Sequence, residues 1–284
     1  MTSVLRLGGV ALIACRAAAP GSRRVPHPDD ASKQVEYFVA QPPGPGPWPT
    51  VVLLHGHQDG LGPGGLLGGT PGGRQFVDWG VLTQLARRGY LAVAVSQPGY
   101  GRSSGPADFA GPFTQHAVAG VLTRLRAEGR IAPRRLVLEG VSRGALVAGL
   151  VGACDSTVSG LVLISGAYDL TAYVRDARDP AAGPAQQAVV RALTAETGGS
   201  PAALRARSVL PVAGAIRAAT LVLSGAQDAR TSAAQAQELA AAIVRAGGRA
   251  RAVVYPAFGH QLPVAVRNAA VDPFIDSVLR ARTP

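Results

Sequence analysis

The sequence predicts an α/β protein with a mostly parallel, doubly wound sheet that carries helices on both faces. Three observations lead to this fold class. Short apolar runs alternate with longer segments of helical spacing along nearly the whole chain. The central runs, such as residues 50–54 and 161–164, are continuously apolar, as parallel strands buried on both faces should be. The 284 residues are 47% hydrophobic and 16% charged, a composition that can bury a substantial core.

These patterns place the expected elements in chain order. Residues 17–33 are rich in Ala, Pro, Arg and Asp and are expected to form an irregular linker, and the proline- and glycine-rich residues 41–49 a turn. Strands are expected at residues 34–40, 50–54, 90–95, 135–139, 161–164, 220–223 and 252–255. Helices are expected at residues 76–89, 113–128, 232–246 and 263–281, with a further helical run directly after the strand at 135–139.

One segment interrupts the alternation of strands and helices. Residues 169–217 hold two plausible helices together with several Gly and Pro, which is too much chain for an ordinary connection. We therefore expect a small helical cap inserted over the sheet. Residues 34–284 then form one domain, and residues 1–33 are interpreted as an export signal and linker.

The N-terminal residues are similar to a targeting segment. Arg6 precedes the apolar run 7–15, which is too short to cross a bilayer but suits the apolar part of an export signal. Leu12-Ile13-Ala14-Cys15 also resembles a bacterial lipobox, which implies lipidation of Cys15 as the one route to membrane attachment. Two locations stay open: an exported protein, periplasmic or lipid-anchored, and a cytoplasmic one.

The formal net charge of +11 comes almost entirely from arginine, because Lys33 is the only lysine. The arginines are scattered, with no run of five or more and few aromatic residues among them. A nucleic-acid-binding surface gathers its basic residues on one face, so this pattern indicates solvated surfaces and no nucleic-acid partner. The sequence does not decide the oligomeric state.

Residues 136–150 carry the strongest chemical signal. An apolar run ends in Gly140-Val141-Ser142-Arg143-Gly144, and a helical run rich in Ala, Leu and Val follows at once. A serine at such a junction sits in strained backbone that pushes its hydroxyl outward, and the glycines leave room for the neighbouring strand and helix. The helix N-terminus also favours a negative oxygen at this point. Ser142 is therefore the candidate nucleophile; the alternative is a glycine-rich turn whose serine only caps a helix.

A serine hydroxyl needs a base that removes its proton and an acid that orients the base. In open α/β sheets such groups follow the carboxyl ends of strands. Asp228 and His260 each follow one of the last two predicted strands, so the chain order is Ser, Asp, His. Asp169, which follows an earlier strand, is the rival acid.

This order and context resemble the α/β-hydrolase superfamily over about residues 35–282. With the motif Gly99-Tyr100-Gly101-Arg102-Ser103-Ser104-Gly105 ahead of the serine, the chain is most similar to the catalytic domain of the prolyl oligopeptidase family and to its dienelactone-hydrolase-like relatives. The resemblance implies an α/β-hydrolase fold with a small helical cap. It also implies that Ser142, Asp228 and His260 form a catalytic triad.

The resemblance further implies where an oxyanion hole lies. His55-Gly56 fits the oxyanion loop of the superfamily, so the backbone N–H groups of His57 and Arg143 are expected to hold the oxyanion, with Gln58 as the alternate to His57. The prolyl oligopeptidases proper use a tyrosine hydroxyl as one donor. No tyrosine stands in this loop of the sequence.

The expected function is a serine hydrolase that cleaves an ester or amide bond, peptide bonds included, through an acyl-enzyme. Residues 169–217 and the glycine-rich loop at 61–73 are expected to select the substrate, a small-molecule ester or a peptide. No cofactor is expected, because no cluster has metal-ligand spacing and this loop lacks the Gly-Lys-Ser/Thr ending of a phosphate-binding loop. The alternatives are a carboxylesterase or thioesterase of small acyl groups, a cofactor-free haloperoxidase or transacylase, and a non-catalytic binding protein of the same fold.

Overall fold

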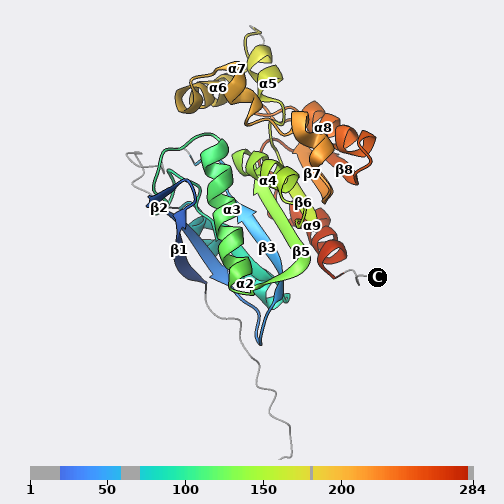
Figure 1. Ribbon diagram of the computed structural model, residues 1–284. Coiled ribbons are helices and arrows are strands. Elements are labelled where there is room, and N and C mark those ends of the chain that lie inside the picture. Colours follow the sequence, from blue (N-terminus) through green and yellow to red (C-terminus); the bar gives the residue numbers. More distant parts are fainter. Residues whose placement is uncertain (1–19, 59–70, 180–181, 281–284) are drawn as a thin grey trace, which may run out of the picture.

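The computed structural model describes residues 20–58, 71–179 and 182–280 of the chain. Eight described strands form one sheet in the order β1-β2-β4-β3-β5-β6-β7-β8. The neighbours from β4 to β8 are parallel, whereas β1 and β2 are antiparallel to the strands they pair with. Helices cover both faces (Figure 1), which confirms the predicted α/β class with a mostly parallel, doubly wound sheet.

The described elements have the following bounds. The strands are β1 (Gly21–His27), β2 (Asp30–Ala40), β3 (Trp48–Leu54), β4 (Leu91–Val95), β5 (Ile131–Val141), β6 (Gly160–Ile164), β7 (Ala219–Gly225) and β8 (Ala250–Tyr255). The helices are α1 (Arg74–Asp78), α2 (Val81–Arg87), α3 (Pro112–Ala127), α4 (Arg143–Cys154), α5 (Leu170–Asp176), α6 (Pro184–Thr197), α7 (Pro201–Arg205), the short 3-10 helix η1 (Leu210–Ala215), α8 (Ala233–Arg245) and α9 (Val264–Leu279). Every strand and helix expected from the sequence overlaps one of these elements.

Two hydrophobic clusters lie on the two faces of the sheet. The first packs α3, α4 and α8 against one face, and the second packs α1, α2 and α9 against the other. Side chains alternate between the clusters along β5, so that Val137 joins the second and Leu138 the first. Figure 1 shows α3 and α4 lying across the front of the sheet. The carboxyl ends of the central strands are therefore held in a frame that is buried on both faces.

The lead-in to the domain differs from the sequence expectation. The expected linker at 17–33 contains β1 and the start of β2, which pair as an antiparallel hairpin with Val25 opposite Val35. β1 is an edge strand and mostly exposed, so its sequence shows no hydrophobic pattern and tolerates Pro26. The sheet therefore begins at Gly21, before the expected domain boundary at residue 34.

The helix expected at 76–89 is two short helices, α1 and α2. Trp79 and Gly80 separate them, and Gly80 has a φ of 72°, in the left-handed region that glycine adopts readily. The apolar spacing continues across the break because both helices pack on the same face of the sheet. The break turns Trp79 outward, where it is 62% exposed.

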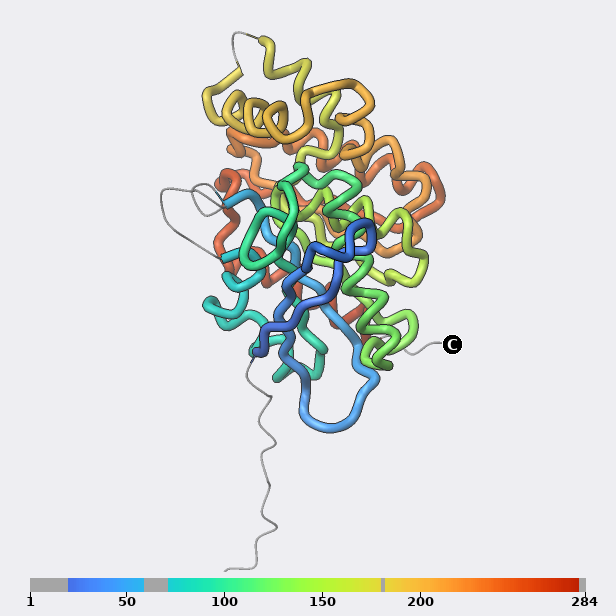
Figure 2. Tube along the Cα trace, turned by 60° about the vertical axis from the view of Figure 1, so that its left-hand side comes forward, coloured from blue at the N-terminus to red at the C-terminus, as the bar shows by residue number. Residues whose placement is uncertain are grey.

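Between β6 and β7 the chain forms a helical insertion of α5, α6, α7 and η1. In Figures 1 and 2 the three α-helices, coloured yellow to gold, gather at one end of the molecule beyond the sheet. Asp169 begins α5, and its carboxylate accepts hydrogen bonds from the backbone N–H groups of Thr171 (2.9 Å) and Ala172 (3.0 Å). The Tyr173 hydroxyl donates to the carbonyl oxygen of Arg230, which ties α5 to the loop after β7.

Residues 1–19 and 59–70 lie outside the described part of the chain. The expected export segment with Cys15 and most of the expected loop at 61–73 therefore stay predictions. Within the described ranges, no helix combines the length and the apolar character that crossing a bilayer requires.

Candidate active site

Ser142 stands at the turn between β5 and α4. β5 ends at Val141 and α4 begins at Arg143, and Ser142 itself has a φ of 54° and a ψ of −120°. Such a backbone conformation costs a non-glycine residue on the order of 1–3 kcal/mol, and it persists only where the surrounding structure enforces it. The turn is the strained strand-to-helix junction that the sequence predicts.

Close packing explains the two glycines of this turn. A Cβ added to Gly140 would lie under 3.0 Å from the carbonyl oxygen of Gly144, and one added to Gly144 would lie as close to the carbonyl oxygen of Leu54. These neighbours are backbone atoms, which cannot swing aside as a flexible side chain can. β3 and α4 therefore fix the position of Ser142 from two sides.

His260 is oriented by Asp228. Asp228 follows β7 and His260 follows β8, and His260 Nδ1 lies 2.8 Å from Asp228 Oδ2. The other carboxylate oxygen accepts from the backbone N–H groups of Arg230 (2.8 Å) and Thr231 (3.0 Å), and the Thr231 hydroxyl donates to Oδ2 (2.6 Å). The Asp228 side chain is fully buried, whereas that of His260 is 14% exposed. The carboxylate thus holds the ring through Nδ1 and leaves Nε2 on the far side.

These partners keep Asp228 ionised. Burial by itself would raise the pKa of the carboxyl, but hydrogen bonds from His260 and Thr231 outweigh burial and hold the pKa below its usual value. A negative Asp228 favours the tautomer of His260 that carries its proton on Nδ1, which makes Nε2 a proton acceptor. The rival acid, Asp169, is engaged instead with the first turn of α5.

Ser142, His57, Arg143 and His260 line one cavity of about 130 Å³. The structure thus brings four of the five predicted site residues to one place, and Asp228 reaches it through His260. The rest of the lining is mostly small or apolar, with one cation and one hydroxyl: Phe109, Leu146, Ala167, Ala185, Ala188, Val189, Ala192, Arg230 and Thr231. Several of these belong to α6, so the helical insertion forms one wall of the cavity.

The loop after β3 brings His57 to the cavity. His55 is buried at its start, where Nε2 accepts from the N–H of Gln97 (3.1 Å) and Nδ1 lies 2.8 Å from the carbonyl oxygen of Gly56. Burial lowers the pKa of His55 to about 4, so the ring is neutral and serves to shape the loop. A Cβ on Gly56 would lie 3.2 Å from the Cβ of Ser142, so this loop touches the turn that carries the serine.

The side chain of Arg143 forms a buried ion pair that the sequence did not predict. It is 2% exposed, and its Nη2 lies 2.6 Å from Oε1 of Glu196 on α6 and 2.9 Å from Nδ1 of His57. The guanidinium carbon lies 4.5 Å from the ring centre of Phe109, whose N–H donates to Glu196 (2.8 Å). The Tyr100 hydroxyl meets the same His57 Nδ1 at 2.7 Å. One network therefore joins the helix after the serine, the loop after β3 and the insertion.

Sequence reasoning missed this network because its members lie far apart in the chain. Arg143 and Glu196 are 53 residues apart, and no local pattern distinguishes Glu196 from the other acids of the chain. Tyr100 belongs to the glycine-rich motif noted in the sequence, but nothing local directs its hydroxyl to His57. The one available signal is a charged residue at the start of an otherwise apolar helix, directly after Ser142.

The arrangement offers acid–base and nucleophilic groups. One cavity is bordered by a hydroxyl, by an imidazole that a carboxylate holds, and by the first N–H of α4. This N–H has no acceptor inside its helix. Among the described residues, no group of three or more His, Cys, Asp and Glu side chains is arranged to hold a metal ion.

Comparison with known proteins identifies a family and a set of structures of similar fold. Residues 114–275 match the family model described as the prolyl oligopeptidase family. This range contains Ser142, Asp228 and His260 and covers more than half of the 284 residues. No sequence among the curated proteins matches the chain.

Solved structures of similar fold include peptidases and an esterase. An acylaminoacyl peptidase from Pyrococcus horikoshii has a TM-score of 0.71 at 16% identity, over 93% of this chain and 42% of its own. A puromycin-hydrolyzing peptidase from Mycobacterium tuberculosis has a TM-score of 0.71 at 18% identity, over 97% of this chain and 41% of its own. An esterase from Pyrococcus furiosus has a TM-score of 0.63 at 18% identity, over 95% and 91%. This chain therefore spans about two fifths of the length of the two peptidases, and at these identities the likeness is one of fold.

Proposed function

The chain belongs to the prolyl oligopeptidase family, and from this membership and the geometry of the site we propose that it is a serine hydrolase of esters or amides. The observation that carries the proposal is the 2.8 Å hydrogen bond between His260 and Asp228 beside a cavity that Ser142 also lines. Residues from three separate strand ends converge there. This convergence supports their assignment as nucleophile, base and orienting acid.

In the proposed reaction, Nε2 of His260 takes the proton of the Ser142 hydroxyl while the oxygen attacks the substrate carbonyl carbon. The bond to the leaving group then breaks, the leaving group takes the proton from His260, and the acyl group stays on Ser142. A water molecule attacks this ester with His260 again as base. Its products are the free acid and the restored hydroxyl.

The oxyanion formed in both halves of the reaction needs preorganised donors. The N–H of Arg143 begins α4 and points from the positive end of the helix dipole, and the N–H of His57 follows Gly56, which packs on Ser142. Loss of one such donor typically costs about 3 kcal/mol of transition-state stabilisation. The Arg143 side chain does not compete for this task, because Glu196 and His57 engage it.

The cavity favours a small apolar acyl group. Its volume is about 130 Å³, and a cavity of about 150 Å³ is known to admit benzene. The α6 wall consists largely of Ala185, Ala188 and Ala192, whose short side chains leave this space, and Phe109 and Leu146 add apolar surface. We therefore expect acyl groups of about four to six carbon atoms to fit best.

A panel of p-nitrophenyl esters from acetate to decanoate, run beside the matched p-nitroanilides, tests the proposal. We expect turnover to peak between butyrate and hexanoate and to disappear in Ser142→Ala. Ala192→Phe, which fills the cavity from α6, should move the optimum to acetate, whereas Ala195→Phe on the exposed side of the same helix should not.

The outcomes of the panel separate the alternatives. Hydrolysis of the anilides shows the amidase activity that a peptidase needs, and hydrolysis of the esters alone assigns an esterase. Equal turnover by wild type and Ser142→Ala, or no turnover of any compound, would contradict the proposed chemistry. The second of these results would favour a non-catalytic binding protein.

A further inference from the structure

A second cavity lies between α2 and α9, on the face of the sheet opposite α4. Its volume is about 150 Å³, and it shares no lining residue with the cavity at Ser142. Leu85, Val271 and Ile275 give it an apolar wall, and Trp79 and Val264, 62% and 63% exposed, are among its lining residues. Since a cavity of about 150 Å³ admits benzene, this one has room for a ligand of about six to eight heavy atoms.

Glu139 brings a carboxyl group to this cavity. It lies on β5, where the alternation of side chains directs it to the same face as Val137, toward α9. The residue is only 7% exposed, yet within the described part of the chain it makes no hydrogen bond and no ion pair. Buried carboxylates in proteins are nearly always paired or hydrogen-bonded, and this one opens on the cavity, where a bound group can reach it.

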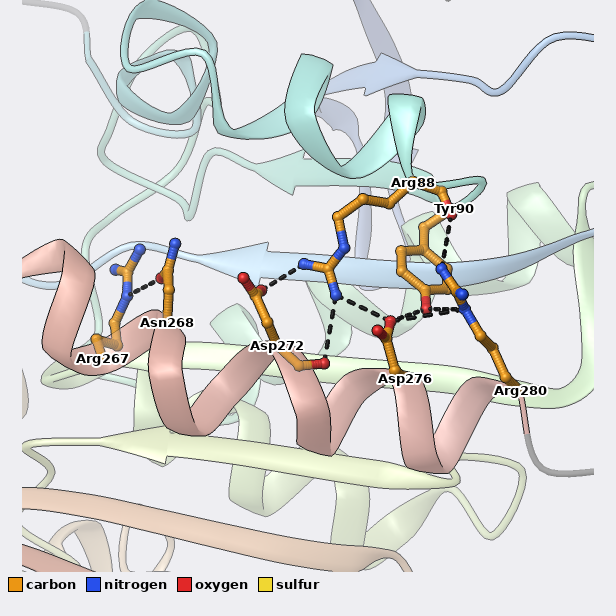
Figure 3. Close-up of polar contacts among 7 residues, drawn as sticks. All are labelled: Arg88, Tyr90, Arg267, Asn268, Asp272, Asp276 and Arg280. Atoms are coloured by element: carbon orange, nitrogen blue, oxygen red, sulfur yellow. Dashed lines mark hydrogen bonds and ion pairs between the residues drawn. The ribbon is translucent and has the colours of Figure 1, made fainter.

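The two arginines of the cavity are placed differently. Figure 3 shows Arg88 reaching from α2 to α9, where Nη1 binds Asp272 and Nη2 lies 2.9 Å from Oδ1 of Asp276. Arg267 turns along α9 instead, with its Nε 3.1 Å from Oδ1 of Asn268. Among the described residues no carboxylate lies within ion-pair distance of Arg267. Within the described ranges, Glu139 and Arg267 thus act on each other electrostatically, but neither is in ion-pair contact with an opposite charge.

We propose that this cavity binds a free α-amino acid with a small apolar side chain. The ammonium group of the ligand binds Glu139, its carboxylate binds Arg267, and its side chain packs on the apolar wall. The charged lining residues are two acids and two arginines, Glu139, Asp272, Arg88 and Arg267, whose charges sum to zero. A zwitterion keeps that balance, whereas an amine or a carboxylic acid alone would leave one of the two unpaired groups without its complement.

The ionisation of Glu139 links binding to pH. Burial raises the pKa of its carboxyl, Arg267 and Arg88 lower it, Asp272 raises it further, and the balance lies above the usual value. The ammonium binds the ionised carboxylate. Affinity should therefore weaken as the pH falls, starting at a higher pH than an ordinary glutamate would give.

Calorimetric titration of the full chain with L-valine at neutral pH tests the proposal. Two compounds of similar shape serve as controls. L-Valinamide keeps the ammonium group of valine but lacks the carboxylate, and isovalerate keeps the carboxylate but lacks the ammonium group. We expect valine to bind, and we expect the affinity for each of the other two compounds to be lower by a factor of about ten or more. Equal affinity for valine and valinamide would overturn the role of Arg267, and absence of valine binding would overturn the proposal.

Two variants assign the binding to this cavity. Glu139→Gln and Arg267→Gln are each expected to weaken valine binding about tenfold, whereas Glu238→Gln, an exposed acid on α8, should leave it unchanged. Arg267 is only partly buried, so its variant keeps the test valid even if Glu139→Gln does not fold. Binding that survives both substitutions would contradict the proposal. The readout is binding alone, so it does not depend on the proposed hydrolase activity.

Discussion

Two cavities of this protein, the one at Ser142 and the one between α2 and α9, lie beside buried carboxylates in opposite environments. Asp228, at the end of β7, receives hydrogen bonds from His260 and Thr231 and from the backbone of Arg230, and its pKa lies below the usual value. Glu139, on β5, is buried without such a donor among the described residues, and its pKa lies above the usual value. Burial acts on both in the same direction, so the donors decide the outcome.

This difference indicates what each cavity is ready to do. At the strand ends, charged groups have partners within the protein: Asp228 accepts a hydrogen bond from His260, and Arg143 forms an ion pair with Glu196. Such a site is organised before a substrate arrives. Between α2 and α9, Glu139 has no hydrogen-bonding partner among the described residues, and the proposed amino acid supplies one through its ammonium group. Removing a charge should accordingly reduce turnover or stability strongly at the first cavity and change stability little at the second.

Asp228→Asn should show the largest effect. The amide can donate to His260 Nδ1 and so favours the tautomer with its proton on Nε2, which cannot accept the serine proton. We expect ester turnover to fall about 10⁴-fold. The matched control is Asp169→Asn, the rival acid, which keeps an N-cap side chain and should retain turnover within about tenfold. Equal losses in the two steady-state measurements would contradict the assignment of Asp228.

Glu196→Gln should have the second largest effect, which is a loss of stability. It leaves the Arg143 guanidinium, 2% exposed, without a buried counter-charge, and breaking such a pair costs about 3 kcal/mol. Urea unfolding measures the loss, and Arg191→Gln on the exposed side of α6 should change stability by less than about 0.5 kcal/mol. The double variant with Arg143→Met should be less destabilised than the sum of the two single variants. Strict additivity would show that the pair is not coupled.

His55 should make stability fall in mild acid. Its pKa is about 4 in the folded protein, against 6.5 for an ordinary histidine, so the unfolded chain takes up the proton first. The contribution is complete above pH 6.5 and is lost as the pH falls toward 4, by up to about 3 kcal/mol. Urea unfolding across this range should show a shallower loss in His55→Asn than in wild type. Equal slopes would mean that His55 is not the buried neutral group described above.

Glu139→Gln should have the smallest effect on the protein without ligand. A carboxyl whose pKa is raised in the folded state lowers stability above that pKa, and the amide removes this cost. We expect the free energy of unfolding at neutral pH to be unchanged or higher by up to about 1 kcal/mol. Thermal or urea unfolding measures this directly. A clear loss of stability would indicate that Glu139 is paired in solution, with Arg267, the cation that lowers its pKa most, as the candidate partner.

The frame of the site follows from local rules, and the sequence predicts it well. Continuous apolar runs identify β3, β4 and β6. The glycines on either side of Ser142 indicate a tight turn, where close backbone packing leaves no room for a side chain. Parallel strands end at one edge, so Asp228 and His260, which follow late strands, are expected to meet there, and they do. Their catalytic roles stay proposals.

The features that sequence reasoning missed depend on contacts between distant segments or on weak local signals. β1 is an exposed edge strand rich in arginine, so no hydrophobic pattern reveals it. The break between α1 and α2 rests on the backbone of Gly80 alone. Arg143 pairs with Glu196 only once the chain is folded, because the pairing depends on which side chains meet in space. The same holds for the surroundings of Glu139, which has no hydrogen-bonding partner among the described residues.

The most direct test of the account is to map a fluorophosphonate adduct by mass spectrometry on the purified chain. If His260 activates Ser142, the adduct forms on the peptide that contains Ser142, is absent in Ser142→Ala and forms far more slowly in His260→Ala. An adduct on another residue, or labelling of His260→Ala at the wild-type rate, would contradict the central claim.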